Sequence, residues 1–188
     1  VQVPILTTRS TVERQVTVNW KMTDTTNMFK FYVYRDTTAT ALTLIDSVGS
    51  SSRSYVDNNV QTSTKYFYRI RLENKQYVLG DYSNEGSVSV LNEPKLNSPT
   101  NLSVNQSLTP VLKYGKTRYS QQYKVQLSTS KNFTTNVIDQ TISGDSLKVV
   151  SALNYNSYYY WRVRSVDSLG YSKWSDTFRM QTKVQVPI

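Results

Sequence analysis

Short stretches that alternate apolar and polar residues run along the whole chain, and this period of two constrains the fold more than any other feature. In residues 66–72 the alternation puts aromatic and aliphatic side chains on one face of an extended strand and arginines on the other. No window carries the 3.6-residue apolar stripe of a helix that faces a core. We therefore predict an all-β fold of short antiparallel strands packed as a sandwich. The predicted strands cover residues 16–20, 29–34, 42–45, 66–72, 111–114, 123–127, 145–150 and 159–164.

The strand pattern occurs twice, which predicts two domains. The chain has 188 residues and 21.6 kDa, enough for two sandwiches of similar plan. Residues 92–99 read as a linker, because Pro94 and Pro99 have no backbone N–H to donate to a ladder. We place the domains at residues 1–93 and 94–188.

The two halves align at specific residues. Each has an aliphatic residue six positions before a tyrosine, and the tyrosine is followed by two aromatic residues, Arg, an aliphatic residue and Arg. The aliphatic–tyrosine pairs are Val60/Tyr66 and Leu153/Tyr159.

These features resemble fibronectin type III domains, over nearly the whole chain. Trp20 matches the inward tryptophan of an early strand in that family, and the two tyrosines match the corner that opens the sixth strand. Tyr114 replaces the early tryptophan in the second half. The resemblance implies two tandem antiparallel β-sandwiches of the fibronectin type III or immunoglobulin-like kind. It says little about function, because the family supplies spacers, adhesive modules and receptor modules alike.

Residues 171–175, Tyr-Ser-Lys-Trp-Ser, resemble the Trp-Ser-x-Trp-Ser element of cytokine-receptor domains. The resemblance predicts a cation–π ladder, in which Trp174 lies flat beside Arg162 and Arg164, with Tyr171 as a further member. The favoured interpretation is that the ladder stiffens one sheet face, and the alternative is a surface contact. The first half has Glu85 in place of the tryptophan, where an ion pair with Arg69 or Arg71 would replace the stack.

Fifteen tyrosines give the chain a second candidate contact surface. Alternation assigns Tyr159 and Trp161 to the core, which leaves Tyr160 as an exposed candidate. Exposed tyrosine among Asn and Ser suits binding surfaces, and aromatic rings stack on sugars. Core packing remains the favoured explanation for most of the tyrosines.

The pentapeptide Val-Gln-Val-Pro-Ile occurs at residues 1–5 and again at 184–188. The simplest interpretation is a tandem array with a period of 183 residues, in which the last strand runs through the second copy into the next unit. Strand exchange between separate chains and an artefact of how the segment is cut are the alternatives. The candidate linker or strand residues are Val1, Val3, Pro4, Val184, Val186 and Pro187.

Composition excludes several kinds of chemistry. The sequence has no cysteine and no histidine, so disulfides, Cys/His zinc sites and histidine-dependent triads are absent. We expect no cofactor, no metal and no enzymatic activity. The net charge is +9, with twelve Lys/Arg and four Asp/Glu in residues 94–188, but these basic residues are dispersed. We therefore expect a solvated surface rather than nucleic-acid binding, and no membrane insertion.

These observations lead to one functional expectation and one alternative. We expect a non-catalytic structural repeat unit of an extracellular stalk or filament, from a secreted or cell-surface protein of bacterial type, whose partners are neighbouring copies of itself. The alternative is an adhesin or an accessory module that binds surface polysaccharide.

Overall fold

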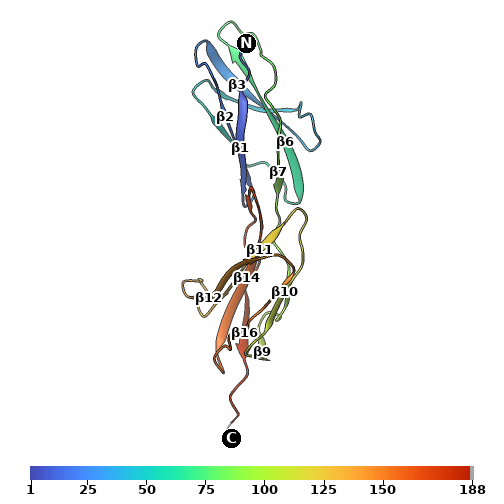
Figure 1. The fold of residues 1–188 in the computed structure, drawn as a ribbon, viewed down its shortest axis with the longest axis vertical. Coiled ribbons are helices and arrows are strands. Elements are labelled where there is room, and N and C mark those ends of the chain that lie inside the picture. The colour runs from blue at the N-terminus through green and yellow to red at the C-terminus, as the bar shows by residue number, and fades with distance from the viewer. Residues whose placement is uncertain (187–188) are drawn as a thin grey trace. The chain divides into compact units, whose positions relative to one another are not determined.

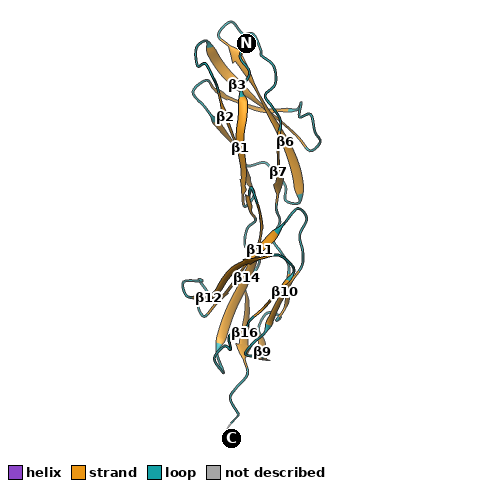
Figure 2. Ribbon diagram, in the orientation of Figure 1, coloured by secondary structure: helices purple, strands orange, loops and turns teal. Residues whose placement is uncertain are grey.

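The computed structural model describes residues 1–186, except for the side chains of Thr8 and Ser10. It divides the chain into two compact units, Val1–Val90 and Leu91–Ile188. This boundary falls directly after a strand, whereas the sequence placed it at Glu93. Strands joined by loops make up both units, and the described residues contain no helix (Figure 2). Accordingly, no helix among residues 1–186 has the length and apolar character needed to cross a membrane.

Unit 1 is built from two layers of antiparallel strands. In one layer β1 pairs with β2 and β2 with β5; the other layer has the order β4-β3-β6-β7, in which β3 and β6 lie side by side (Figure 1). Alternation along each strand places one face of each layer in the core. The bounds are β1 (Ile5–Val12), β2 (Gln15–Lys21), β3 (Met28–Asp36), β4 (Leu44–Gly49), β5 (Ser54–Asp57), β6 (Thr64–Asn74) and β7 (Gly86–Val90).

The core of unit 1 joins the two layers through aromatic side chains. Trp20 on β2 is 3% exposed, and its ring centroid lies 5.4 Å from that of Phe31 on β3. This confirms the inward tryptophan predicted from the sequence. Tyr68 on β6 is fully buried and donates its hydroxyl hydrogen to Asp57 Oδ2 at 2.8 Å. Arg35 Nη1 also donates to that oxygen, at 2.7 Å, so the buried carboxylate is paired.

Unit 2 has the same plan with a divided first strand. One layer has the order β13-β10-β8, and in the other β12, β11, β14 and β16 pair in turn, with β9 parallel to β16. The short β15 pairs with the end of β14. The bounds are β8 (Leu96–Ser98), β9 (Ser103–Gln106), β10 (Val111–Tyr114), β11 (Gln122–Ser128), β12 (Asn136–Ile142), β13 (Ser146–Lys148), β14 (Tyr158–Asp167), β15 (Gly170–Tyr171) and β16 (Phe178–Thr182).

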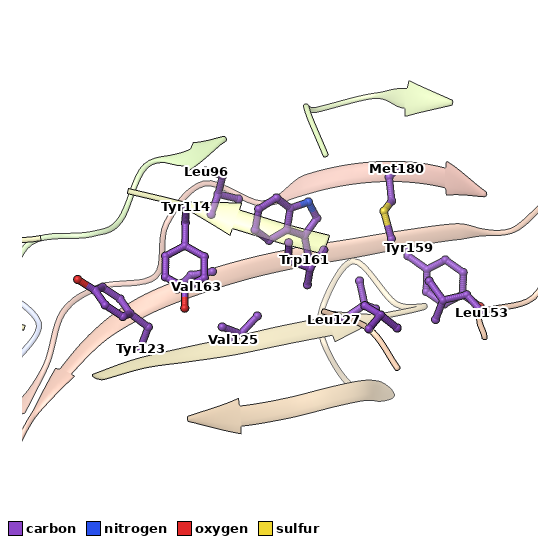
Figure 3. Close-up of a cluster of buried hydrophobic side chains, with 12 residues drawn as sticks. Leu96, Tyr114, Tyr123, Val125, Leu127, Leu153, Tyr159, Trp161, Val163 and Met180 are labelled. Atoms are coloured by element: carbon purple, nitrogen blue, oxygen red, sulfur yellow. The ribbon is translucent and has the colours of Figure 1, made fainter. Parts of the chain in front are cut away.

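Trp161 is the largest fully buried side chain of the unit 2 core (Figure 3). Its ring meets Phe178 on β16 edge to face, with centroids 6.0 Å apart. Tyr114 occupies the position of the early-strand tryptophan, is 2% exposed, and packs on Tyr123. Burial raises the pKa of the Tyr114 hydroxyl, and the nearby Tyr123 adds to this effect.

Both predicted tyrosine corners are present. Tyr66 accepts a hydrogen bond from the backbone N–H of Gln61 at 3.0 Å, and Tyr159 accepts one from Asn154 at 3.1 Å. Each tyrosine lies one or two positions inside the start of its strand and is buried. The hydroxyl therefore ties the preceding loop to the strand that crosses the middle of its sheet.

Two sequence-based expectations about the linkers are wrong. The predicted linker 92–99 contains β8, because Leu96 is buried and pairs with Tyr114. The last strand ends at Thr182 and does not continue through Val184 and Val186. β9 ends at Gln106, whose carbonyl accepts from Lys183 N–H, and no partner strand extends beyond that bond among the described residues.

Candidate functional site

The candidate site predicted from the sequence lies on the outward face of β14. Trp161 and Val163 point into the core, so the alternation turns Arg162 and Arg164 to the other face of the sheet. The register places Gln126 and Lys124 of β11 opposite these two arginines. The face is therefore polar, and both of its arginines are half-buried.

Trp174 lies against both arginines, as the sequence predicts. Its ring centroid is 4.2 Å from the Arg162 guanidinium carbon and 4.6 Å from that of Arg164. Tyr171 stacks on the other side of Arg164 at 3.9 Å. Phe133 stacks on Arg162 at 3.9 Å. The cation–π ladder thus consists of Phe133, Arg162, Trp174, Arg164 and Tyr171.

Phe133 is the member that sequence reasoning missed. It lies in the loop between β11 and β12, within a stretch rich in Ser and Thr, and is 8% exposed. Its neighbours in sequence show no alternation that would mark it as inward-facing. Only the loop conformation, with a positive φ of 57° at Phe133, brings its ring to Arg162.

Hydrogen bonds extend the ladder across the sheet. Arg162 Nε donates to Gln126 Oε1 at 2.9 Å, and Gln126 Nε2 donates to Asp139 Oδ2 at 3.0 Å. Asp139 Oδ1 is 3.0 Å from Lys124 Nζ. Burial opposes ionisation of Asp139, but hydrogen bonds from Lys124 and Gln126 and the charges of Lys124 and Arg164 prevail and lower its pKa.

Two serines hold the segment that carries Trp174 against β14. Ser172 Oγ accepts from Ser165 N–H at 3.0 Å and donates to the Lys173 carbonyl. Ser175 Oγ accepts from Val163 N–H at 3.0 Å and donates to the Asp176 carbonyl. Each serine side chain thus replaces a strand partner for β14. This explains the serines of the Tyr-Ser-Lys-Trp-Ser element in physical terms.

Unit 1 carries a reduced version of the same arrangement. Tyr82 lies over Arg71 at 4.5 Å and over Arg69 at 5.6 Å. Arg69 Nε is 3.1 Å from Glu85 Oε2, which is the ion pair predicted to replace the missing tryptophan. Ser83 Oγ accepts from Ile70 N–H, as the serines of unit 2 do.

Tyr160 is not part of the ladder. It is half-buried and lines a shallow pocket of about 260 Å³ together with Leu102, Lys131 and Arg179. Asn101 and Thr177 complete the lining. Arg179 also lies over the exposed ring of Tyr158 at 4.8 Å. The structure therefore separates Tyr160 from the other four predicted site residues.

The candidate linker residues have different surroundings in the two copies of the pentapeptide. Val1 and Val3 are exposed, Pro4 is buried, and β1 begins directly after it. Val184 and Val186 are 60% and 77% exposed. Pro187 lies outside the described residues. No group of three or more Asp or Glu side chains that would suit a metal ion occurs in residues 1–186.

Comparison with known proteins gives a structural likeness without a sequence family. No family model and no curated protein matches the sequence. The FN1–FN3 domains of chicken CNTN1 match with a TM-score of 0.50 at 19% identity, over 96% of this chain and 67% of that chain. A beta-1,2-glucanase from Parabacteroides distasonis matches with a TM-score of 0.43 at 15% identity, over 48% of this chain and 13% of that one. Pectate lyase PelI from Erwinia chrysanthemi matches with a TM-score of 0.41 at 15% identity, over 54% and 30%.

Identities this low concern the fold alone. The CNTN1 likeness agrees with the two-layered units, the buried Trp20 and the two tyrosine corners. The chain folds as fibronectin type III-like β-sandwiches.

Proposed function

We propose that this chain is a non-catalytic structural module, the repeat unit of a stalk or filament in a secreted or cell-surface protein of bacterial type. Its partners are neighbouring copies of itself. The observation that carries the proposal is the recurrence of Val-Gln-Val-Pro-Ile at residues 1 and 184 of a chain built from sandwiches. Recurrence of a sequence at a fixed spacing is expected of serial arrays, in which each unit contacts mainly its neighbours.

The ladder supports a structural role over a binding role. Each guanidinium contacts two aromatic rings. The cations and ring faces that a ligand would contact are therefore already paired with one another. Such stacking fixes the loop with Phe133 and the segment with Trp174 onto one sheet. A module that transmits force or sets a distance benefits from a stiffened face of this kind.

The fold and the composition also suit the proposed location. Fibronectin type III-like domains serve as structural and adhesive modules. The absence of cysteine makes the fold independent of redox conditions. These features support the proposed location outside the cell.

The experiment that tests the proposal is the mass of the intact native polypeptide together with a peptide map. A mass many times 21.6 kDa, with peptides in which Ile188 is followed by Leu-Thr-Thr-Arg, is the expected result. A mass near one unit, with no peptide continuing past Ile188, would refute the array.

A second candidate function is binding of surface polysaccharide. The observation that favours it is the pocket at Tyr160, where an aromatic ring lies beside the cationic Lys131 and Arg179. Saturable binding to an acidic glycan, abolished by Tyr160→Ala, would support this function. Arg162→Ala serves as the comparison, because Arg162 belongs to the ladder and does not line the pocket. A spacer without such a function shows no saturable binding in a glycan panel.

A further inference from the structure

Val1 and Gln2, in the first copy of the repeated segment, lie in a groove of unit 1 and contact specific groups there. Gln2 Nε2 donates to Asp24 Oδ2 at 2.9 Å, and Gln2 Oε1 accepts from Asp24 N–H at 3.1 Å. Thr23 Oγ1 also donates to Gln2 Oε1, at 3.3 Å. The amide group of one side chain is thus read by both a donor and an acceptor of Asp24, which requires glutamine or asparagine chemistry.

Steric fit adds to these hydrogen bonds. A Cβ atom built on Gly80 would lie 2.9 Å from Val1 Cγ1 and 3.3 Å from the Gln2 carbonyl oxygen. Gly80 therefore lets the segment approach the backbone closely. Its own N–H donates to the Leu72 carbonyl at 2.8 Å, which fixes Gly80 beside β6.

Asp24 itself is held in place for this contact. Thr26 donates to its carboxylate from the backbone N–H at 2.8 Å and from the hydroxyl at 3.0 Å. These two bonds, together with the bond from Gln2, lower the pKa of Asp24 although burial opposes them. The acceptor is thus charged and oriented. We call the surface of Thr23, Asp24, Thr26, Asn27, Leu72, Asn74 and Gly80 the Asp24 groove.

The groove continues beyond the segment that occupies it. An open volume of about 500 Å³ is lined by Val1 and Gln2 together with Asp24, Thr26, Asn27, Leu72 and Asn74. Asp24 is the one acidic side chain among these lining residues. The open volume therefore adjoins both Val1 and the negatively charged Asp24.

The second copy of the segment has the matching sequence and lacks such contacts. Val184 and Val186 are strongly exposed, and Gln185 forms no hydrogen bond with any described residue. The last backbone bond before them is Lys183 N–H to the Gln106 carbonyl. Lys183 directly precedes the repeated valine, and its positive charge is complementary to that of Asp24 in the groove.

We propose that Val184–Gln185–Val186 of one copy occupies the Asp24 groove of a second copy, as residues 1–3 do in the structure. Gln185 then makes the paired hydrogen bonds with Asp24, and Lys183 lies near the Asp24 carboxylate. In the array proposed above, on which this inference rests, the segment is shared: it ends one copy and docks on the next. The docked segment fixes the junction between copies instead of leaving it as a free linker.

Exposed apolar side chains adjoin the groove and the segment, and they would be covered in such a junction. On unit 1, the rings of Phe29 and Tyr77 meet at 5.3 Å while Tyr77 remains 72% exposed. Near the segment on unit 2, Val104 lines a shallow pocket with Val184 and is 64% exposed. Burial of these groups favours association of the two surfaces.

A deletion variant tests the proposal, because it empties the groove. Removal of residues 1–4 leaves the Asp24 groove free for Val184–Val186 of another molecule. We expect sedimentation velocity to show dimers and longer species that grow with concentration. Additional removal of residues 184–188 is expected to restore the monomer. A deletion variant that stays monomeric at every concentration would contradict the proposal.

A synthetic peptide with the sequence of residues 183–188 gives a second readout. The doubly truncated chain is expected to bind this peptide saturably. It is expected to bind a peptide with Gln185→Ala about tenfold more weakly, because the paired hydrogen bonds with Asp24 are lost. A peptide with Lys183→Glu is also expected to bind more weakly. Equal binding of all three peptides, or no binding, would overturn the proposal.

Two controls keep the outcome interpretable. If the deletion variants do not fold, the full chain with Gln2→Ala provides a groove from which the first copy is readily displaced by the same peptides. The proposed array and the proposed docking can also be refuted independently. A native mass of one unit refutes the array and leaves groove binding testable, whereas a multiple mass without peptide binding refutes only the docking.

Discussion

Arg162 and Arg164 carry like charges on the same face of β14, two positions apart. Burial, and then the charge of Arg164, lowers the pKa of the Arg162 guanidinium, while Asp139 acts in the opposite direction. Aromatic faces compensate, because their negative quadrupoles lie against both cations. Each guanidinium contacts two aromatic rings, and Trp174 contacts both guanidinium groups. These contacts offset the repulsion between the two like charges on one strand.

Trp174 is the central ring of the ladder and contacts both cations. We expect Trp174→Ala to lower the free energy of unfolding by about 1–4 kcal/mol, since two cation–π contacts of about 0.5–2 kcal/mol each are lost. Urea denaturation measures this loss. Lys173→Ala, an exposed change in the same segment, is the matched control and is expected to shift stability by less than about 0.5 kcal/mol. Equal effects of the two substitutions would show that the stack contributes nothing.

Buried tyrosines predict a loss of stability at alkaline pH. Burial raises the pKa of Tyr68 and Tyr114 above the usual value of 10.0, and Asp57 adds to the effect at Tyr68. Above pH 10 the unfolded chain releases these protons while the native state retains them, so the native state binds more protons and its stability falls as pH rises. Chemical denaturation below and above pH 10 measures this slope.

Tyr114→Phe is the informative variant for that slope. The Tyr114 hydroxyl is buried without a hydrogen-bond partner among the described residues. Its removal deletes one titrating group and one unpaired polar group, so we expect stability at neutral pH to be unchanged or higher and the alkaline slope to be smaller. An unchanged slope would show that Tyr114 ionises in the native state as readily as in the unfolded chain.

At the scale of strands, the tyrosine corner links a loop to the central strand of its sheet. We expect Tyr159→Phe to cost about 1–2 kcal/mol, because the Asn154 N–H loses its acceptor while the ring remains in the core. Tyr66→Phe is expected to behave similarly through Gln61. The exposed Tyr158→Phe controls for loss of a tyrosine hydroxyl from the same strand. Thermal denaturation of the three variants measures these losses of stability.

The sequence predicted strands with a clear buried face, such as residues 66–72 and 159–164, but it missed β5, β9 and β12 and misplaced several strand ends. The strand expected from Leu42 starts at Leu44, because the Asp36 carboxylate accepts hydrogen bonds from the backbone N–H groups of Leu42 and Thr43. β8 was not predicted, because it lies between Pro94 and Pro99. Period-two alternation indicates which face of a strand is buried. Where a strand begins or ends depends instead on side-chain hydrogen bonds and on the length of the neighbouring strand.

The candidate site shows the same division. Arg162, Arg164, Trp174 and Tyr171 were identified because they lie on strands or in a recurring motif with fixed spacing. Phe133 was not, since a loop with a left-handed residue carries it to the stack. Asp57 accepts hydrogen bonds from Arg35 and Tyr68 inside unit 1, although these partners lie 22 and 11 positions away in the sequence. Contacts between residues distant in sequence have no periodic signal.

At the scale of the whole molecule, each unit has a hydrophobic core of its own, which predicts separate stabilities. Leu127 is fully buried in unit 2, and Leu127→Ala is expected to cost about 2–5 kcal/mol through lost burial and the cavity left behind. Hydrogen exchange read by mass spectrometry reports each unit separately. We expect peptides from residues 91–186 to lose protection and peptides from residues 1–90 to keep theirs. Val33→Ala, in the core of unit 1, is the reciprocal variant. Loss of protection in both units from either substitution would show that they unfold as one cooperative body, and the nearly additive stability expected of a serial array would not hold.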